Sequence, residues 1–497
     1  MSSTLSDSIP DALSGLVVDL LGDGREGDRP AARGNGFLDL PPERVLPFNA
    51  LDELCFHLNT DNFAWTIQLE VRAPGPIDER RLRTAVAAAA QRHPMARARL
   101  AHYRPTDRRY AWEIMPELPA DPVWVARAAT DEALAQIRQD VLSSVVPLDQ
   151  APPFRVWLVR RGDGRASEER ASRQPPGDRG DGDTLLLAAS HVATDGMGAM
   201  RLLRSIVRAY AGVADPVAPV DPEIGRDLVS LASPGTMVDH VERIVGVGTS
   251  LRRSKGRLAR IAVDGGEAGA PGFRFHHMRI TSAELGTMDL KRHPGATVND
   301  LLLAALHLAI SDWNADHARE AERISVMMPM NMRPDDTWHE TLGNVSLMAP
   351  VSTSPEDRDD AGAIVHAVAD QTRRAKRTGS ASLLLDLLER SHLLPSVAKK
   401  FLPFLSPLSR DVFIDTAVLS NLGRVAEPLD FGEGDHGGVA TELWFSPPAR
   451  MPLGVGVGAA THEGDLFLSF RCCQAQFDAA GAASFAEYFR AALQFVA

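Results

Sequence analysis

The hydrophobic positions of this chain follow the two periods of regular secondary structure. Apolar residues alternate with polar ones in 63–74, which is typical of a strand with one buried face. In 77–93 they recur at helical spacing behind Asp78, a residue type that caps helix N-termini well. The same criteria predict strands at about 96–115, 153–161, 183–191, 273–280, 324–332, 346–352 and 412–423, a closing hairpin at 453–472, and helices at 196–211, 297–317, 361–377 and 485–495.

These elements form two groups that a segment of different composition separates. Residues 212–272 have Pro-rich and Gly-rich ends around a basic stretch, 251–261, that we expect to be helical. The pattern therefore predicts an N-terminal lobe at 36–211, this bridging segment, and a C-terminal lobe at 273–497. Residues 1–35 are mostly polar, and we expect them to form a poorly ordered arm. Because both groups mix helices with largely antiparallel strands, the predicted fold class is α+β.

Length, charge and cysteine usage narrow the class of function. A chain of 497 residues is too long for one simple core, which agrees with two lobes. The net charge of −12 argues against nucleic acid as a partner, because phosphate binding needs clustered Lys and Arg. No apolar run is long enough to span a bilayer, and the N-terminus lacks the pattern of a secretory signal. Cys55, Cys472 and Cys473 make no disulfide framework, so we expect structural thiols, no metal site and a cytoplasmic location.

The stretch S-H-V-A-T-D-G, residues 190–196, carries the strongest candidate chemistry. A strand that ends at His191 would present the imidazole at the edge of a sheet, and Gly196 would begin the next helix. A neutral histidine there could take a proton from a hydroxyl, an amine or a thiol. The free N–H groups of the helix N-terminus could stabilise an oxyanion. On spacing alone, however, a structural turn is the simpler explanation of these seven residues.

The surroundings of this stretch resemble the condensation-domain superfamily of acyltransferases. Residues 190–196 resemble its HHxxxDG motif, and 146–159 its Leu-Asp and Pro-Phe-Arg segment. The nearest branches are the polyketide-associated acyltransferases and the wax ester synthase/diacylglycerol acyltransferases. The Asn-Asp motif, the Pro-x-x-x-Arg-Pro and Gly-Asn segments and the late Ser-Asn strand of the latter have counterparts at 296–306, 329–350 and 418–425. Order and spacing fit from about residue 46 to the C-terminus.

The resemblance implies a fold and a reaction. The fold would be two lobes like chloramphenicol acetyltransferase, related by a pseudo-repeat, with an active-site tunnel between them. An acyl thioester, either acyl-CoA or an acyl carrier protein, would meet a small-molecule or lipid alcohol or amine in the tunnel. His191 would act as general base, and the N–H near Gly196 would stabilise the oxyanion. The product would be an ester or an amide, with no cofactor and no covalent acyl-enzyme, because holding both reactants together supplies much of the rate.

The resemblance also implies structural roles around the histidine. Asp195 would pair with an arginine and hold the loop, with Arg333 as the first choice of partner and Arg155 as the second; solvated arginines are the alternative. Two departures from the family pattern matter. Ser190 stands where the family has its first motif histidine, which changes the hydrogen bonding at the site. Residues 151–157 lack the Pro-Leu-Trp of the wax ester branch, which weakens a prediction of wax ester or triacylglycerol synthesis.

Further residues are candidates for contact with substrate. Asn299 and Asp300 would line the tunnel, or would instead cap the helix that follows them. Asn421 would face the channel, or would only make a turn. The stretch 381–409 has apolar helical faces beside Lys399, and it is interpreted either as core packing or as a surface helix that contacts lipid or an acyl chain, which would place the protein at the membrane periphery.

Two other functions remain open at this point. With Ser190 in place of a histidine, the chain could have lost turnover and could bind a carrier protein or an acyl ligand. A thioester hydrolase is the third interpretation. The pair His276 and His277 lacks a following Asp-Gly and lies in a predicted strand, so we expect it to be structural. The sequence also lacks the motifs of serine hydrolases, P-loop proteins and zinc proteases.

Overall fold

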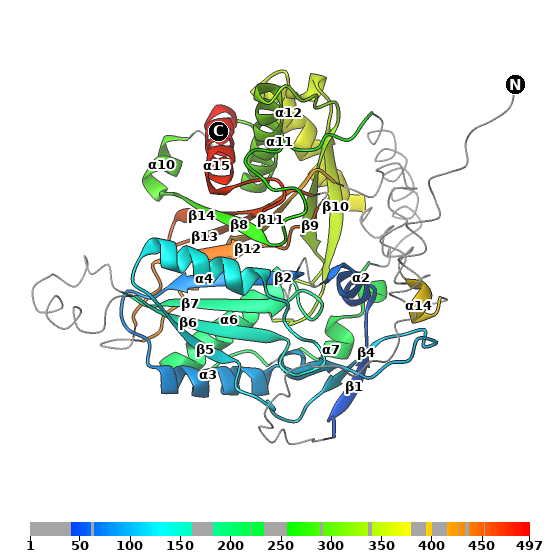
Figure 1. Cartoon of the computed structure of the whole chain (residues 1–497), viewed down its shortest axis with the longest axis vertical. Coiled ribbons are helices and arrows are strands. Elements are labelled where there is room, and N and C mark those ends of the chain that lie inside the picture. Colours follow the sequence, from blue (N-terminus) through cyan, green and yellow to red (C-terminus); the bar gives the residue numbers. More distant parts are fainter. Residues whose placement is uncertain are drawn as a thin grey trace, which may run out of the picture. The chain divides into compact units, whose positions relative to one another are not determined.

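The chain folds as two lobes that each combine a sheet with helices (Figure 1). The computed structural model describes residues 41–60, 64–161, 182–218, 220–232, 256–288, 292–335, 340–378, 394–399, 415–425, 427–432, 437–451 and 453–497. In these ranges the strands are β1 (Arg44–Pro47), β2 (Thr66–Arg72), β3 (Ala98–Leu100), β4 (Ala111–Ile114), β5 (Val123–Ala128), β6 (Phe154–Arg161), β7 (Thr184–Ser190), β8 (Phe273–Ile280), β9 (Ile324–Asn331), β10 (Ser346–Thr353), β11 (Ala417–Arg424), β12 (Glu442–Ser446), β13 (Val455–His462) and β14 (Asp465–Cys473). The helices are α2 (Ala50–Leu58), α3 (Glu79–Arg92), α4 (Asp131–Ser143), α6 (Gly196–Ala211), α7 (Pro222–Gly225), α8 (Leu228–Ala232), α10 (Ser282–Thr287), α11 (Val298–Asp316), α12 (Ala361–Thr378), α14 (Ser396–Lys399) and α15 (Ala479–Val496).

The sheet of the N-terminal lobe has the strand order β12-β2-β7-β6-β5. Its middle strand, β7, runs antiparallel to β2 and β6, whereas β5 runs parallel to β6. The helices α3 and α6 contact each other beneath this sheet, and α4 lies on its other side, against β8 of the second lobe (Figure 1). The edge strand β12 comes from late in the chain and places Phe445 opposite Leu69 of β2. The segment predicted as the C-terminal lobe, 273–497, therefore supplies one strand to the sheet of the other lobe.

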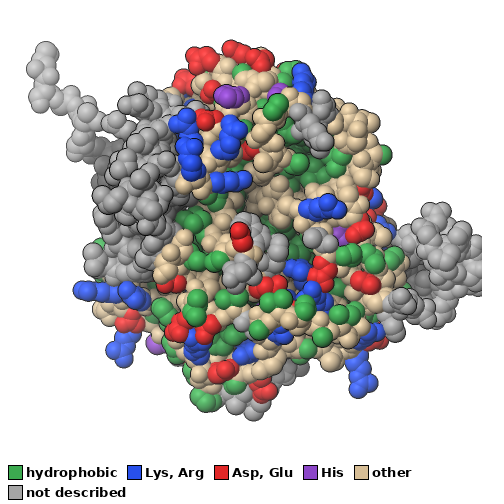
Figure 2. All heavy atoms as spheres, turned by 180° about the vertical axis from the view of Figure 1, so that it is seen from behind, with side chains coloured by type: hydrophobic (Ala, Val, Ile, Leu, Met, Phe, Trp, Pro, Cys, Tyr) green, Lys and Arg blue, Asp and Glu red, His purple; other side chains and the backbone are tan. Residues whose placement is uncertain are grey.

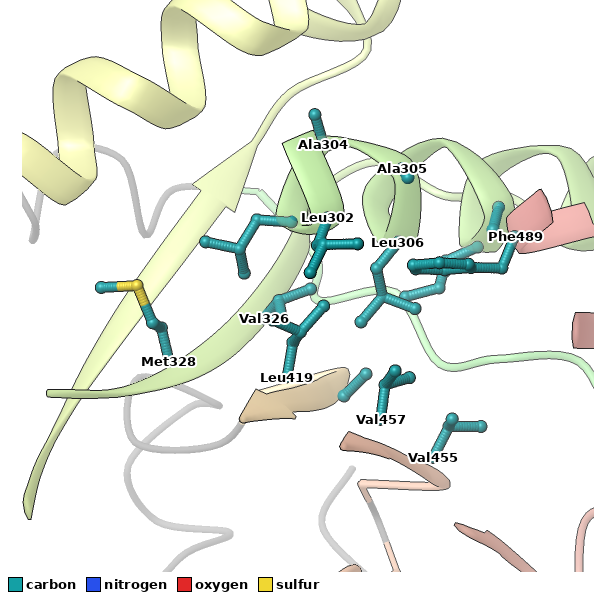
Figure 3. Packing of buried hydrophobic residues seen from close by; sticks show 14 of the residues in the cluster. Leu302, Ala304, Ala305, Leu306, Val326, Met328, Leu419, Val455, Val457 and Phe489 are labelled. Carbon is teal, nitrogen blue, oxygen red and sulfur yellow. The ribbon is translucent and has the colours of Figure 1, made fainter. Parts of the chain in front are cut away.

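The sheet of the C-terminal lobe has the strand order β10-β9-β11-β13-β14-β8. Only β11 runs parallel to its neighbours among these strands, and the other pairs are antiparallel. One face is covered by α11, α12 and α15 (Figure 1). Figure 3 shows Leu302 and Leu306 of α11 above Val326 of β9 and Leu419 of β11, with Phe489 of α15 beside them. Burial of each such side chain stabilises the lobe by about 1.5–3 kcal/mol, so this face of the sheet is committed to the core.

The structure confirms the α+β fold class and most of the predicted elements. The predicted helix at 196–211 coincides with α6, and the predicted strand at 273–280 coincides with β8. The basic helix predicted at 251–261 is wrong over its described part, 256–261, which is not helical. Leu258 there makes an isolated bridge to Arg323, because burial of the apolar residues against the C-terminal core outweighs the helical propensity of the segment. The elements β5 and α4 lack counterparts in the prediction, and residues 1–35 lie outside the described ranges.

The apolar stretch 381–409 is described only at 394–399, so the lipid contact considered for it lies mostly outside the described residues. Lys399 is buried rather than solvated. Its Nζ donates to the carbonyl of Arg108 at 2.7 Å and pairs with the carboxylate of Glu53 at 2.7 Å. These contacts attach the short helix α14 to the N-terminal lobe. Within the described ranges, no helix combines the length and apolarity needed to cross a bilayer.

Candidate functional site

The candidate catalytic turn connects β7 to α6. The strand ends at Ser190, and the N–H groups of Ala193 and Thr194 both donate to the Ser190 carbonyl, at 3.0 and 3.3 Å, which closes the turn. The N–H of His191 still donates to the carbonyl of Trp65 at 2.9 Å, so the histidine continues the ladder between β7 and the start of β2 by one residue. Because β7 is the middle strand, its end has neighbours on both sides and is held rigidly.

Asp195 joins this turn to the other half of the chain. It is the N-cap of α6 and accepts from Gly198 N at 2.9 Å. Its two carboxylate oxygens face the guanidinium of Arg333 at 2.8 and 2.9 Å, and both side chains are buried. Val345 N and the hydroxyl of Ser346 also donate to Asp195, at 2.9 and 2.8 Å. Of the two arginines considered as partners, the structure therefore places Arg333 against Asp195.

These contacts determine the charge of Asp195. Burial alone would raise the pKa of the Asp195 carboxyl, but the guanidinium of Arg333 and the backbone N–H groups of Gly198 and Val345 outweigh burial and hold that pKa below its usual value. Asp195 is consequently ionised at neutral pH. A carboxylate that accepts from so many donors holds the turn and is poorly suited to accept a proton from substrate.

His191 is half-buried and lines a cavity. Its Nδ1 lies 3.1 Å from Oδ1 of Asn344 and 3.7 Å from Sγ of Cys55, and its ring stacks on Trp65 at a centroid distance of 6.4 Å. Burial lowers the pKa of His191 below its ordinary value, although the charge of Asp195 opposes this shift. The imidazole is thus neutral at physiological pH, which is the state that a general base requires.

Asn344 and Asp52 support the histidine. The Gly-Asn segment within 329–350 contains Asn344, but neither residue was predicted to act at the site. The Nδ2 of Asn344 donates to the carbonyls of His191 and Val192, at 2.8 and 2.9 Å, and to Oδ1 of Asp52 at 3.1 Å. Asp52 is fully buried in α2 and forms an ion pair with Arg226. The available sequence signal was a capping box at the start of α2, which indicates a helix N-terminus but not a role at the site.

A cavity of about 720 Å³ lies beside the turn. Both halves of the chain supply its walls, and the C-terminal sheet contributes the face that is not covered by helices. Methionine is frequent in the lining, and this flexible side chain adapts to irregular apolar ligands. The lining includes Trp65, Ile67, His191, Gly196, Met197, Asn299, Met327, Met330, Met332, Met348, Ser420, Asn421, Leu422, Phe445 and the cationic residues Lys376 and Arg424.

The lining of this cavity includes six of the predicted residues: His191, Asp195, Arg333, Gly196, Asn299 and Asn421. Gly196 starts α6 there, and a Cβ on it would come within 2.9 Å of the Phe445 ring, so a larger residue would require this ring to move. Asn299 lines the cavity with its Nδ2 at 3.2 Å from the sulfur of Met328. Asn421 lines the cavity and also makes a turn, since its Oδ1 accepts from Gly423 N at 2.8 Å beside an irregularity in β11.

Two predicted residues lie elsewhere. Asp300 is buried, and one carboxylate oxygen accepts from Thr297 N and Oγ1 at 2.8 Å, while the other accepts from the Thr372 hydroxyl at 2.6 Å. It completes the capping box of α11, so the assignment of Asp300 to substrate binding is corrected to helix capping. Ser190 is buried under the turn, where its Oγ accepts from Val192 N at 3.3 Å, and it is not part of the cavity lining.

The histidine pair is partly buried, and the cysteines lie in the packed interior. His277 is stacked on Trp444 with centroids 4.4 Å apart. Cys55, Cys472 and Cys473 are buried free thiols, and burial raises the pKa of each. Over the described part of the chain, no group of three or more His, Cys, Asp or Glu side chains is placed to hold a metal ion.

Comparison with curated proteins identifies a close mycobacterial relative. The uncharacterized protein Rv2305 of Mycobacterium tuberculosis is 36% identical over 430 residues, which cover 86% of this chain and 94% of that protein. Tyrocidine synthase 2 of Brevibacillus parabrevis is 24% identical over 329 residues, which cover 62% of this chain and 8% of the synthase. No protein-family model matches the chain.

Solved structures show the same fold at low sequence identity. The first condensation domain of the calcium-dependent antibiotic synthetase, in complex with a substrate analogue, gives a TM-score of 0.65 at 12% identity and covers 92% of this chain and 97% of that domain. A variant of the starter condensation domain of rhizomide synthetase, in complex with C8-CoA, gives 0.62 at 14% identity, with 91% and 94% covered. The epimerization domain from the third module of tyrocidine synthetase B gives 0.60 at 18% identity, with 91% and 97% covered.

Proposed function

We propose that this chain, which is in one family with Rv2305 of Mycobacterium tuberculosis and has the fold of condensation domains, is an acyltransferase of the condensation-domain superfamily. It would transfer an acyl group from a thioester to a hydroxyl or amine acceptor. The observation that carries this proposal is His191. It is a neutral imidazole at the wall of a cavity to which both halves contribute, with Nδ1 occupied by Asn344. Nε2 is then the ring nitrogen that can accept a proton from an acceptor in the cavity.

The proposed reaction needs one group that accepts and later returns a proton, and one site that stabilises an oxyanion. Nε2 of His191 takes the proton of the acceptor O–H or N–H as the acceptor atom attacks the thioester carbonyl carbon. The carbonyl oxygen becomes an oxyanion, which the backbone N–H at Gly196 stabilises at the positive end of α6. Collapse of the tetrahedral intermediate breaks the C–S bond, and the departing thiolate receives the proton from His191. The products are an ester or amide and a free thiol.

The lining of the cavity supports an acyl donor with an apolar chain. Met327, Met330 and Met348 surround the space with flexible apolar side chains. Lys376 and Arg424 are exposed cations at the same cavity, although the whole chain is acidic. Figure 2 shows basic side chains gathered on one part of the upper lobe. Cations at the cavity suit a donor that carries phosphate, such as acyl-CoA or the phosphopantetheine arm of a carrier protein.

Mass spectrometry of the purified protein with a panel of acyl-CoAs and acceptors tests the proposal. The acceptors are long-chain alcohols and diacylglycerol, for which the wax ester branch supplies the rationale, and amines. We expect a new ester or amide, and we expect His191→Ala to lower its rate by about 10²–10⁴-fold, the contribution of a general base. Equal product from both proteins would eliminate His191 as the base.

Two results would redirect the assignment. Product from neither protein with acyl-CoA, but product with an acylated carrier protein, would identify the carrier protein as the donor. Binding of acyl donors without product under either condition would favour the second function, a condensation-like protein that binds a carrier protein or an acyl ligand. Free acid released in the absence of any acceptor would indicate a thioester hydrolase instead.

A further inference from the structure

The orientation of the Asn344 amide follows from its neighbours. Its Nδ2 faces the backbone carbonyls of His191 and Val192 and the carboxylate of Asp52, at 2.8, 2.9 and 3.1 Å. All three groups only accept hydrogen bonds, so the atom that faces them must be the NH₂. The other amide atom, Oδ1, lies 3.1 Å from Nδ1 of His191. An amide oxygen carries no hydrogen, and it can therefore form this bond only if Nδ1 donates.

We propose that Asn344 is a positioning residue that sets the tautomer of His191, with the proton on Nδ1 and an unprotonated Nε2 directed to substrate. The inference rests on the proposed function, in which Nε2 is the base. A neutral histidine has two tautomers, and only one of them leaves Nε2 able to accept a proton. Asn344 thus favours the tautomer in which Nε2 performs the chemistry, and it does so without contacting the acceptor.

Asp52 prevents the Asn344 amide from turning over. Rotation by 180° would place Oδ1 against two carbonyls and a carboxylate, and each buried acceptor left without a donor costs about 1–3 kcal/mol. Asp52 is itself held by the ion pair with Arg226 and by Trp112 Nε1 at 3.0 Å. Asn344 is buried as well, so water cannot compensate for a reversed amide. The chain of contacts from Arg226 through Asp52 and Asn344 consequently leaves one orientation of the ring hydrogen.

The titratable groups around the ring agree with this assignment. Asp195 and Asp52 are the acidic groups whose charges act on His191, and both raise its pKa against the effect of burial. The Cys55 thiol, 3.7 Å from Nδ1, is neutral because burial raises its pKa. Neither Cys55 nor the stacked ring of Trp65 offers Nδ1 an acceptor as strong as the amide oxygen. The backbone of His191 itself also hydrogen-bonds the ring, so Asn344 acts together with that group.

The same short segment holds both ends of the catalytic turn. Asn344 binds the histidine end, and the next residue, Val345, donates its N–H to Asp195 at the helix end. Both residues lie immediately before β10, in the C-terminal half of the chain, whereas the turn belongs to the N-terminal half. The contact of Asn344 with the His191 ring therefore forms only when the two halves are assembled.

Nitrogen NMR of the imidazole measures this tautomer directly, without any substrate. The full-length protein is labelled with ¹⁵N at histidine, and the His191 signals are identified as those that disappear in His191→Ala. We expect Nδ1 of the wild type to resonate as a protonated ring nitrogen and Nε2 as an unprotonated one at pH 7.5 and above. In Asn344→Ala we expect a mixture of both tautomers or the reverse one. Wild-type protein with the proton on Nε2 would overturn the proposal, even if the Asn344 variant failed to fold.

Asn314→Ala is the matched control. Asn314 is equally buried and also holds neighbouring backbone, because its Oδ1 accepts from Ala262 N at 2.8 Å and its Nδ2 donates to the Arg260 carbonyl at 3.0 Å. Removal of its side chain should cost similar stability and leave the His191 signals unchanged. A shift of the tautomer in both variants, or in neither, would show that Asn344 has no specific role.

Kinetics then separate the two proposals. With a donor and an acceptor that the wild type uses, Asn344→Ala should lower kcat by about 10²–10⁴-fold, as expected for a base in the wrong tautomer, with little change in KM for the acyl donor. Wild-type protein without any transfer would refute the proposed function, and the NMR result would still stand. Active wild type with an unaffected kcat in Asn344→Ala would refute the positioning role alone.

Discussion

Two buried carboxylates act on the turn that carries His191, and each is paired with an arginine but has a different role. Asp195 pairs with Arg333, which lies 138 residues away in the chain, and Asp52 pairs with Arg226, which lies 174 residues away. Asp195 holds backbone, since it caps α6 and accepts from the N–H of Val345. Asp52 holds a side chain, which in turn faces the imidazole.

The difference shows that one buried ion pair can fix the position of a backbone turn, while another can fix the orientation of a side chain. Each pair costs desolvation that its own attraction only partly offsets, so neither is explained by stability alone. Asp195 places the turn and sets the electrostatics of His191. Asp52 acts indirectly. It holds the amide of Asn344, and this amide influences which nitrogen of the His191 ring carries the proton. Four predictions separate these two roles, from the largest expected effect on the protein to the smallest.

Arg333→Ala should destabilise the protein by about 3–5 kcal/mol, the cost of leaving a buried charge without its partner. The guanidinium also donates to the carbonyls of Thr341 and Gly343 at 3.0 Å. Its loss removes these bonds as well, although Gly343 still accepts from the N–H of Asp195 at 3.1 Å. Urea unfolding followed by circular dichroism measures the effect. A loss below 1 kcal/mol would mean that Asp195 does not depend on this arginine.

Arg226→Ala should cost less, about 1–3 kcal/mol, because Asp52 keeps other donors. Trp112 Nε1 and Asn344 Nδ2 still face its carboxylate, and α2 begins beside it with a favourable dipole. The same unfolding experiment compares this variant with Arg333→Ala. If Arg226→Ala proved the more destabilising of the two, the contrast between the pairs would be reversed.

The pH dependence of kcat/KM should distinguish the two carboxylates by how strongly the charge of each raises the pKa of His191. Burial lowers the pKa of His191 below 6.5, so activity should persist as the pH falls through 6.5 and should be lost only when the folded protein protonates the ring. The charges of Asp195 and Asp52 both raise the pKa of His191, and Asp195 contributes more. Asp195→Asn should therefore move the acid limb to lower pH, and Asp52→Asn should move it by less. An acid limb that moved upward in Asp195→Asn would contradict this electrostatic account.

Thr297→Ala measures the effect of removing a helix cap without breaking an ion pair. Thr297 caps α11 as Asp195 caps α6, but without an arginine partner. Its removal should cost about 1 kcal/mol, the ordinary value of an N-cap, and should leave kcat and KM within about twofold of the wild type. Thermal unfolding and steady-state kinetics on the same preparation measure both. A large loss of kcat would show that the start of α11 takes part in catalysis after all.

The elements with strong local signals could be predicted from the sequence. Helix 196–211 has apolar residues at helical spacing and begins at the N-cap Asp195, and this local information was sufficient for α6. Residues 256–261 carry basic and apolar residues suited to a helix, yet their burial against the C-terminal core holds them in non-helical conformation. The short strand β12 belongs to the sheet of the other lobe, and pairing between Phe445 and Leu69 leaves no trace in either local sequence.

The candidate site likewise contains residues whose place could be predicted from local sequence and residues whose place could not. The positions of His191, Asp195 and Gly196 follow from a strand, a turn and a helix that are contiguous in the chain. Asn299 and Asp300 are neighbours in the sequence, but the helix they begin turns one toward the cavity and the other into a capping box. Such opposite directions arise because successive helical residues are rotated by about 100°, and the spacing alone did not tell which of the two would face the ligand.

The sequence by itself determined the two groups of elements, the turn that presents the histidine, and the residue types available for proton transfer. It could do so because helix periods, caps and strand alternation are interactions between residues a few positions apart. Only the tertiary structure decided which arginine neutralises Asp195 and which amide faces His191. Those partners meet from distant parts of the chain, and a buried polar group is satisfied by whichever donor or acceptor the packing of the two lobes brings to it.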